Sequence, residues 1–133
     1  CQDFVLSNKI KDVVFEGRVE GEKIVRYFNT CDIFVSPAPF GESFGIVLLE
    51  AMASKKPVVG FANKGYLELL KGTRGEQFLV EPKNVELLAQ KIEELVIDEK
   101  LREKMGEWGL QQAEKYSWEK VADQILNFYQ SLS

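Results

Sequence analysis

The sequence predicts an α/β fold built on a parallel sheet. Short apolar runs at 13–15, 32–36 and 57–61 are typical of strands that are buried on both faces. Segments with helical periodicity lie between these runs, and glycine or proline marks most junctions. Strands that alternate with helices favour a parallel sheet covered by helices. The length suits one core, so residues 1–133 are expected to form a single domain.

Composition narrows the classes of function. The net charge is −4, and no basic run is interleaved with aromatic residues, which argues against a nucleic-acid partner. No apolar run approaches the roughly 18 residues of a membrane span, and no signal segment is visible, so a cytoplasmic protein is expected. Histidine is absent, and Cys1 and Cys31 are not clustered. These counts exclude a histidine-based triad and predict no metal site.

The first part of the chain predicts a ligand-facing loop. A short helix is predicted over 3–10, and the run 13–15 is expected to be a buried strand that ends at Gly17. In open α/β sheets the carboxyl ends of the strands line the ligand crevice. The loop 17–21 is therefore a candidate part of that crevice, with an ordinary polar connection as the alternative. A helix over 22–30 follows.

The central stretch, 39–59, contains the strongest candidate site. Gly45 is expected to begin a helix over 46–53, and a helix start presents free N–H groups that favour an anion. Glu42 and Glu50 bracket this start, and at about 100° per residue a helix would bring the two side chains to about 80° of one another. Carboxylates accept hydrogen bonds from sugar hydroxyls, so the combination suits a sugar nucleotide. Spacing alone leaves two solvated carboxylates as an equal alternative.

The remaining elements complete the α/β pattern. A strand at 57–61 is followed by a helix from Asn63 through Lys71 and a short strand at 77–80. Asn84 is expected to cap the next helix. A helix over 101–116 and an amphipathic last helix capped by Ser117 are expected to close the chain.

Several of these segments resemble one enzyme family. The run Glu-Ser-Phe-Gly-Ile-Val-Leu-Leu-Glu-Ala-Met-Ala at 42–53, with Pro-Val-Val at 57–59, resembles the Glu-x7-Glu signature of retaining glycosyltransferases of the GT4 type. The strand before it, the block that ends at Pro82 and the Tyr-Ser-Trp run at 116–118 resemble further blocks of the family in the same order. The chain departs from the family pattern at Lys64, where a glycine is usual, and at 54–56.

The resemblance implies a Rossmann-like three-layer sheet with helices on both faces, as part of the C-terminal domain of a GT-B fold. It implies that Glu42 is catalytic and contacts the donor hexose, and that Glu50 holds the ribose. Donor contacts are further implied for Ser43, Phe44, Gly45 and Ile46, and near the nucleotide base for Arg18 and Val19.

The implied reaction is the transfer of a hexose from a nucleoside diphosphate sugar with retained configuration and without a metal or other cofactor. The chain is expected to lack the first part of the domain and the N-terminal acceptor domain, and therefore to be inactive alone. An acceptor glycan or lipid, and any peripheral membrane contact, would involve that missing domain. One alternative is a non-catalytic Rossmann-like module that binds a nucleotide or a partner. Another is an unrelated nucleotide or flavin domain, which the loop 17–21 disfavours because it lacks the dinucleotide fingerprint.

Overall fold

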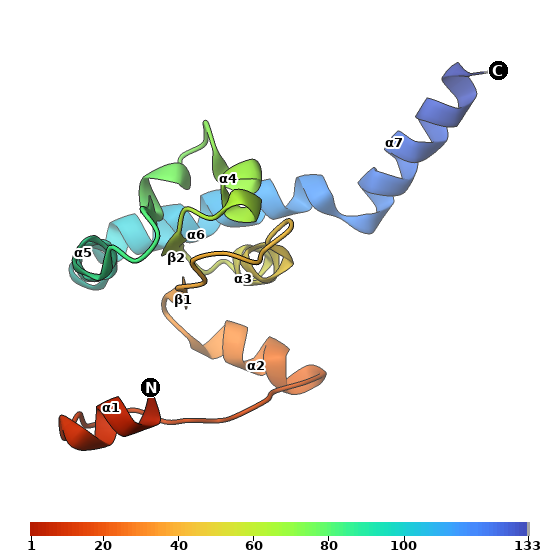
Figure 1. Cartoon of the computed structure of the whole chain (residues 1–133). Helices are drawn as coiled ribbons and strands as arrows, with labels where there is room; N and C mark the ends of the chain where they lie inside the picture. Colours follow the sequence, from red (N-terminus) through yellow and green to blue (C-terminus); the bar gives the residue numbers. More distant parts are fainter. Residues whose placement is uncertain (133) are drawn as a thin grey trace.

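The computed structural model describes residues 1–132 and confirms the parallel α/β fold (Figure 1). Three strands, β1 (Phe34–Ser36), β2 (Val58–Phe61) and β3 (Leu79–Val80), pair in the order β1-β2-β3. Both pairings are parallel, with Phe34 opposite Val58 and Gly60 opposite Leu79. Parallel neighbours require a crossover connection, and helices provide it here.

The helices account for most of the described chain. The α-helices are α1 (Gln2–Ser7), α2 (Glu22–Thr30), α3 (Ile46–Ala53), α4 (Lys64–Leu70), α5 (Val85–Ile97), α6 (Glu99–Ala113) and α7 (Trp118–Ser131), and two short 3-10 helices are η1 (Glu76–Phe78) and η2 (Glu114–Tyr116).

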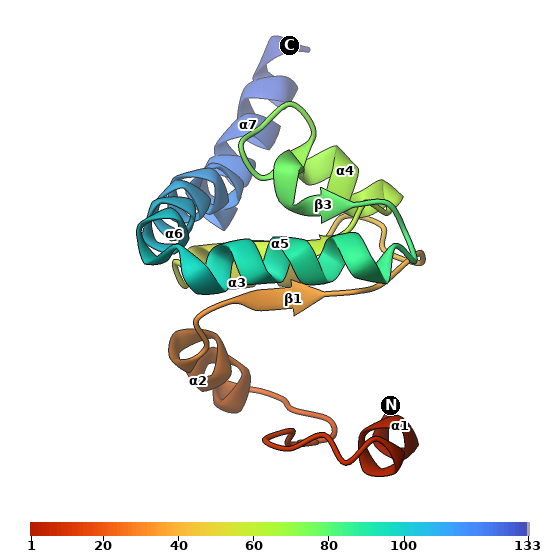
Figure 2. The same ribbon diagram turned by 90° about the vertical axis from the view of Figure 1, so that its left-hand side faces the viewer.

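The helices cover the sheet on two sides, as predicted. On one side Val58 packs with buried residues of α2, α3 and α4, among them Phe28, Leu48 and Tyr66. On the other side Val59 and Phe61 pack with residues of α5, α6 and η1. Figure 2 shows α5 in front of α3, and Figure 1 shows β1 and β2 between these two helices. Successive residues of a strand point to opposite faces, so β2 supplies both cores.

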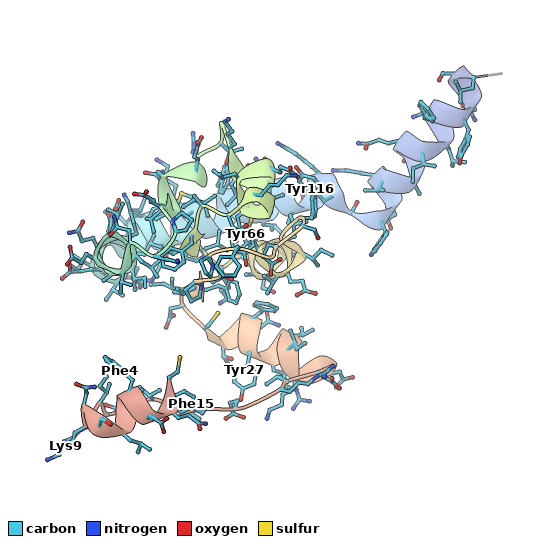
Figure 3. The ribbon with its side chains drawn as sticks, in the orientation of Figure 1. Phe4, Lys9, Phe15, Tyr27, Tyr66 and Tyr116 are labelled. Carbon is cyan, nitrogen blue, oxygen red and sulfur yellow. The ribbon has the colours of Figure 1, made fainter. Side chains whose placement is uncertain are left out.

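The prediction of a buried strand at 13–15 is wrong. Val13, Val14 and Phe15 are 44%, 77% and 46% exposed, and the described sheet contains β1, β2 and β3 alone. Figure 3 shows Phe15 in the N-terminal part of the chain that precedes α2, away from the sheet. An apolar run forms a strand only where it pairs with a neighbouring strand. Residues 13–15 do not pair with β1, which is therefore an edge strand of the described sheet.

Smaller boundary differences have local causes. Gln77 and Phe78 were expected in a strand but belong to η1, because the Phe78 N–H donates to the carbonyl of Gly75 at 3.0 Å. Helix α6 begins at Glu99, two residues before the predicted start, because the Asp98 side chain accepts a hydrogen bond from the Leu101 N–H at 2.9 Å. Such a cap satisfies a donor that the helix start leaves free.

Helices α3 and α6 pack unusually closely at two glycines. A Cβ on Gly106 would overlap the carbonyl oxygen of Lys55, which follows α3. A Cβ on Gly109 would lie 3.2 Å from Cγ of Met52. The Lys55 ammonium also pairs with the Glu107 carboxylate at 2.9 Å. Helix α7, by contrast, has no buried residue and projects away from the sheet (Figure 1).

Candidate donor-binding site

The candidate site lies at the carboxyl edge of the sheet, between the ends of β1 and β2. The segment 37–45 leaves β1 and leads to α3, and the segment 62–63 leaves β2 and leads to α4. Because β1 and β2 are parallel, both connections emerge at the same edge. The sequence predicted the first of these connections as the core of the site.

Asn63 joins the two connections. Its Nδ2 donates to the carbonyl of Ala38 at 2.9 Å, and its Oδ1 accepts from the Tyr66 N–H at 3.0 Å. Asn63 is 5% exposed, so the bond from the Tyr66 N–H is buried, and the bond to the Ala38 carbonyl is partly buried. Burying a polar side chain is costly unless it is hydrogen-bonded, and Asn63 meets that condition while it caps α4.

Two glycines allow the loop to approach α4 closely. A Cβ on Gly65 would lie 2.8 Å from the Glu42 carbonyl oxygen and 2.8 Å from the Phe44 nitrogen, so only a glycine fits beneath this backbone. Gly45 has φ +95° and caps α3, and a Cβ there would lie 2.8 Å from the Tyr66 ring. A left-handed residue in contact with a buried ring favours glycine. The shape of the segment 42–45 is therefore set by packing on α4.

Tyr66 supports this loop from the protein interior (Figure 3). Its side chain is fully buried, and its hydroxyl lies 2.5 Å from Oγ of Ser36. Burial raises the pKa of the Tyr66 phenol, the Ser36 hydrogen bond opposes that rise, and the negative charge of Glu42 adds to it. The Glu42 carboxylate thus helps to raise the pKa of the same buried side chain whose ring lies against Gly45.

Replacement of Tyr66 by phenylalanine tests this arrangement. At neutral pH, Tyr66→Phe is expected to lower the free energy of unfolding by about 1 kcal/mol, because the Ser36 bond is lost. The raised pKa means that the folded state keeps the phenol proton over a range in which the unfolded chain has lost it. The associated stability is fully present below about pH 10 and is lost as the pH rises through the folded pKa.

Urea unfolding between pH 9 and 11 should therefore show a shallower fall in stability for Tyr66→Phe than for the unaltered protein. Tyr116→Phe removes a hydroxyl from a half-exposed ring and serves as the control for the loss of a tyrosine hydroxyl as such. Parallel slopes for Tyr66→Phe and the unaltered protein would contradict the assignment.

The predicted donor-binding residues 42–46 form one continuous stretch at this edge. Glu42 is half-buried in the loop, and Ser43, Phe44 and Ile46 are exposed. Glu50 is exposed on α3. The angle of 80° assumed for the two carboxylates does not apply, because Glu42 precedes the N-cap Gly45 and is not part of the helix. A cleft shared by Glu42 and Glu50 stays a prediction.

Arg18 and Val19 lie beside α2. Arg18 is exposed and forms an ion pair with Glu20. Val19 lines an apolar hollow of about 260 Å³ whose other lining residues are Ile24, Tyr27, Phe28, Cys31, Ile33 and Phe34. Residues 42–50 do not contribute to that lining, so the structure does not join Val19 to the candidate loop through this hollow. Their predicted contact with the nucleotide base stays a prediction.

The sequence did not point to Asn63, Gly65 and Tyr66 as supports of the site. Lys64, the departure from the family pattern, has an 87% exposed side chain that lies 3.9 Å from the Glu68 carboxylate. The glycine that matters for the close approach is the next residue, Gly65. The available signal for the cap was Asn63 at the start of the predicted helix, because asparagine is a preferred N-cap residue.

Two further properties concern residues 1–132 alone. Within that range, no three histidine, cysteine or acidic side chains gather as a set of metal ligands. No helix there combines the length and the apolar character that a bilayer crossing requires.

Comparisons with known proteins identify the family. Residues 5–112 match the family described as glycosyl transferases group 1. The chain is 33% identical to an uncharacterized glycosyltransferase, MJ1178, of Methanocaldococcus jannaschii, over 99% of this chain and 37% of that protein. It is 31% identical to a phosphatidyl-myo-inositol mannosyltransferase of Mycobacterium leprae, over 93% of this chain and 33% of that protein.

A solved structure agrees with these relatives. Sucrose-phosphate synthase from Thermosynechococcus elongatus superposes with a TM-score of 0.83 at 27% identity, over 98% of this chain and 33% of that one. The chain thus spans about a third of the length of the proteins that it matches. With a match over residues 5–112, this chain belongs to the group 1 glycosyltransferases.

Proposed function

We propose that this chain is the donor-binding part of a retaining glycosyltransferase of the GT4 type with a GT-B fold. The observation that carries the proposal is the position of Glu42 and Glu50 on either side of the α3 start, at the carboxyl edge of a parallel sheet. Ligands of open α/β sheets bind at that edge. The family membership supports sugar transfer as the reaction.

Each part of the stretch has a chemical role in this proposal. The first turn of α3 leaves backbone N–H groups without helical partners, and these groups suit the donor diphosphate. Glu50 accepts hydrogen bonds from the ribose hydroxyls. Glu42 accepts from the hexose hydroxyls and stabilises positive charge on the sugar as the bond to the diphosphate breaks. Ser43, Phe44, Gly45 and Ile46 contribute backbone donors, and Arg18 and Val19 lie toward the base.

The donor in this proposal is a nucleoside diphosphate hexose, and no metal or other cofactor takes part. The names of the relatives include a mannosyltransferase acting on phosphatidyl-myo-inositol and a sulfoquinovosyl transferase from Arabidopsis thaliana. We therefore propose a glycan or lipid acceptor bound by a second domain, which would also make any peripheral membrane contact. Residues 1–133 would form one domain of a cytoplasmic enzyme and would not transfer sugar alone.

Calorimetry on the full-length protein tests the donor site. A panel of UDP- and GDP-hexoses identifies the donor that the unaltered protein binds. Glu50→Gln, which keeps the shape and removes the charge, is expected to weaken that affinity at least about tenfold, because hydrogen bonds to charged groups are strong. Glu93→Gln changes an exposed carboxylate on α5 and is the matched control.

Unchanged donor affinity in Glu50→Gln would overturn the proposed site. Donor binding without any transfer to glycan or lipid acceptors would favour the non-catalytic module instead. Where transfer occurs, the anomeric configuration of the product, read by NMR spectroscopy, tests retention.

A further inference from the structure

An aromatic contact joins the candidate donor loop to a distant part of the chain. The ring of Phe44 and the ring of Tyr116 lie edge to face, with centroids 5.7 Å apart and planes at 68°. Phe44 belongs to the loop before α3, and Tyr116 ends η2, the short turn between α6 and α7. Figure 3 shows Tyr116 at the end of α6 where the chain bends toward α7.

The loop is held on its inner side by α4. The Glu42 carbonyl and the Phe44 nitrogen rest over Gly65, and Gly45 rests on the Tyr66 ring. These contacts fix the height of the backbone above α4. They do not involve the Phe44 side chain, which reaches outward to Tyr116.

Tyr116 has a defined position of its own. Helix α6, which precedes it, is packed against α3 at Gly106 and Gly109. The next residue, Ser117, caps α7 by accepting the Lys120 N–H at 3.4 Å. The ring is thus carried by a segment that is ordered on both sides, and the contact with Phe44 uses the ring face and edge rather than the hydroxyl.

We propose that Tyr116 is a positioning residue for donor binding. Its ring holds Phe44, and through Phe44 it keeps the backbone of 42–46 in the shape that receives the diphosphate and the sugar. This inference rests on the proposed function, and Tyr116 itself touches no substrate. An edge-to-face aromatic pair provides a modest stabilisation, which sets the size of the expected effect.

Donor affinity of the full-length protein is the first test, with the UDP- or GDP-hexose that the unaltered protein binds as the probe. Tyr116→Ala is expected to weaken binding about three- to tenfold, which corresponds to the strength of one aromatic pair. Tyr116→Phe keeps the ring and is expected to bind like the unaltered protein. In the donor-free protein, the amide order parameters of 43–46 should fall in Tyr116→Ala, while those of β2 stay unchanged.

A double-mutant cycle decides whether the effect passes through Phe44. Once Phe44→Ala has removed the partner ring, Tyr116→Ala should cause no further loss of affinity. An additive loss would overturn the inference. So would a Tyr116→Ala protein that melts earlier but keeps the affinity and the loop order parameters. The order parameters need no donor, so they test Tyr116 even if Glu50→Gln overturns the donor site.

Discussion

Gly106→Ala is expected to destabilise the fold by about 3 kcal/mol, near the upper end of the cost of overpacking a core. The added Cβ would overlap the Lys55 carbonyl oxygen, which belongs to the backbone and cannot turn aside. Relief requires α6 to move away from α3, and such a movement disturbs the packing of both cores, because α3 contributes to the first core and α6 to both. Alanine favours a helix over glycine by about 1 kcal/mol, which offsets only part of this cost.

Urea unfolding followed by circular dichroism measures this loss, and Gly109→Ala on the same helix is the matched control. The nearest atom to a Cβ at Gly109 is Cγ of Met52, at 3.2 Å. Methionine is flexible and adapts to small changes in volume, so the control is expected to stay within about 1 kcal/mol of the unaltered protein. Equal losses in the two variants would show that the Lys55 contact does not set the spacing of the helices.

Glu42→Gln is expected to lower kcat about a hundredfold or more in the full-length enzyme, with a much smaller change in donor affinity. In the proposed mechanism the carboxylate stabilises positive charge that develops on the sugar only in the transition state. Removing one group that stabilises developing charge has an effect of about this size in other enzymes. Loss of kcat without loss of donor affinity is the signature of such an interaction.

Steady-state kinetics with the donor identified by calorimetry provides the measurement. Glu93→Gln, with its carboxylate on the outer surface of α5, should keep the kcat of the unaltered enzyme. A normal kcat in Glu42→Gln would show that Glu42 is not catalytic. The donor site at Glu50 is tested separately, by the donor affinity of Glu50→Gln.

Local signals in the sequence predicted the centre of the fold well. The segments 22–30 and 46–53 are helices with the predicted bounds, and Gly45 begins the second of them in a left-handed conformation. Asn84 and Ser117 cap helices as predicted. These features depend on residues that are neighbours in the chain, so the sequence contains the information directly.

Features that depend on distant partners were not predictable in the same way. The run 13–15 has the composition of a buried strand, but no neighbouring strand pairs with it in the described structure. The support of the loop by Gly65 and Tyr66, and the contact of Phe44 with Tyr116, join segments far apart in sequence. A single sequence shows which residues are suited to such contacts but not which of them meet.

The strand order β1-β2-β3 has a consequence for how the molecule assembles. Each strand pairs with the next one along the chain, so no strand of the described sheet has to be inserted between two strands that precede it in the chain. The candidate loop and Asn63 follow β1 and β2, so the pairing of these two strands alone brings them to one edge of the sheet. The residues that hold the candidate loop from within, Asn63, Gly65 and Tyr66, all precede β3 in the chain, so the third strand makes no direct contribution to this support.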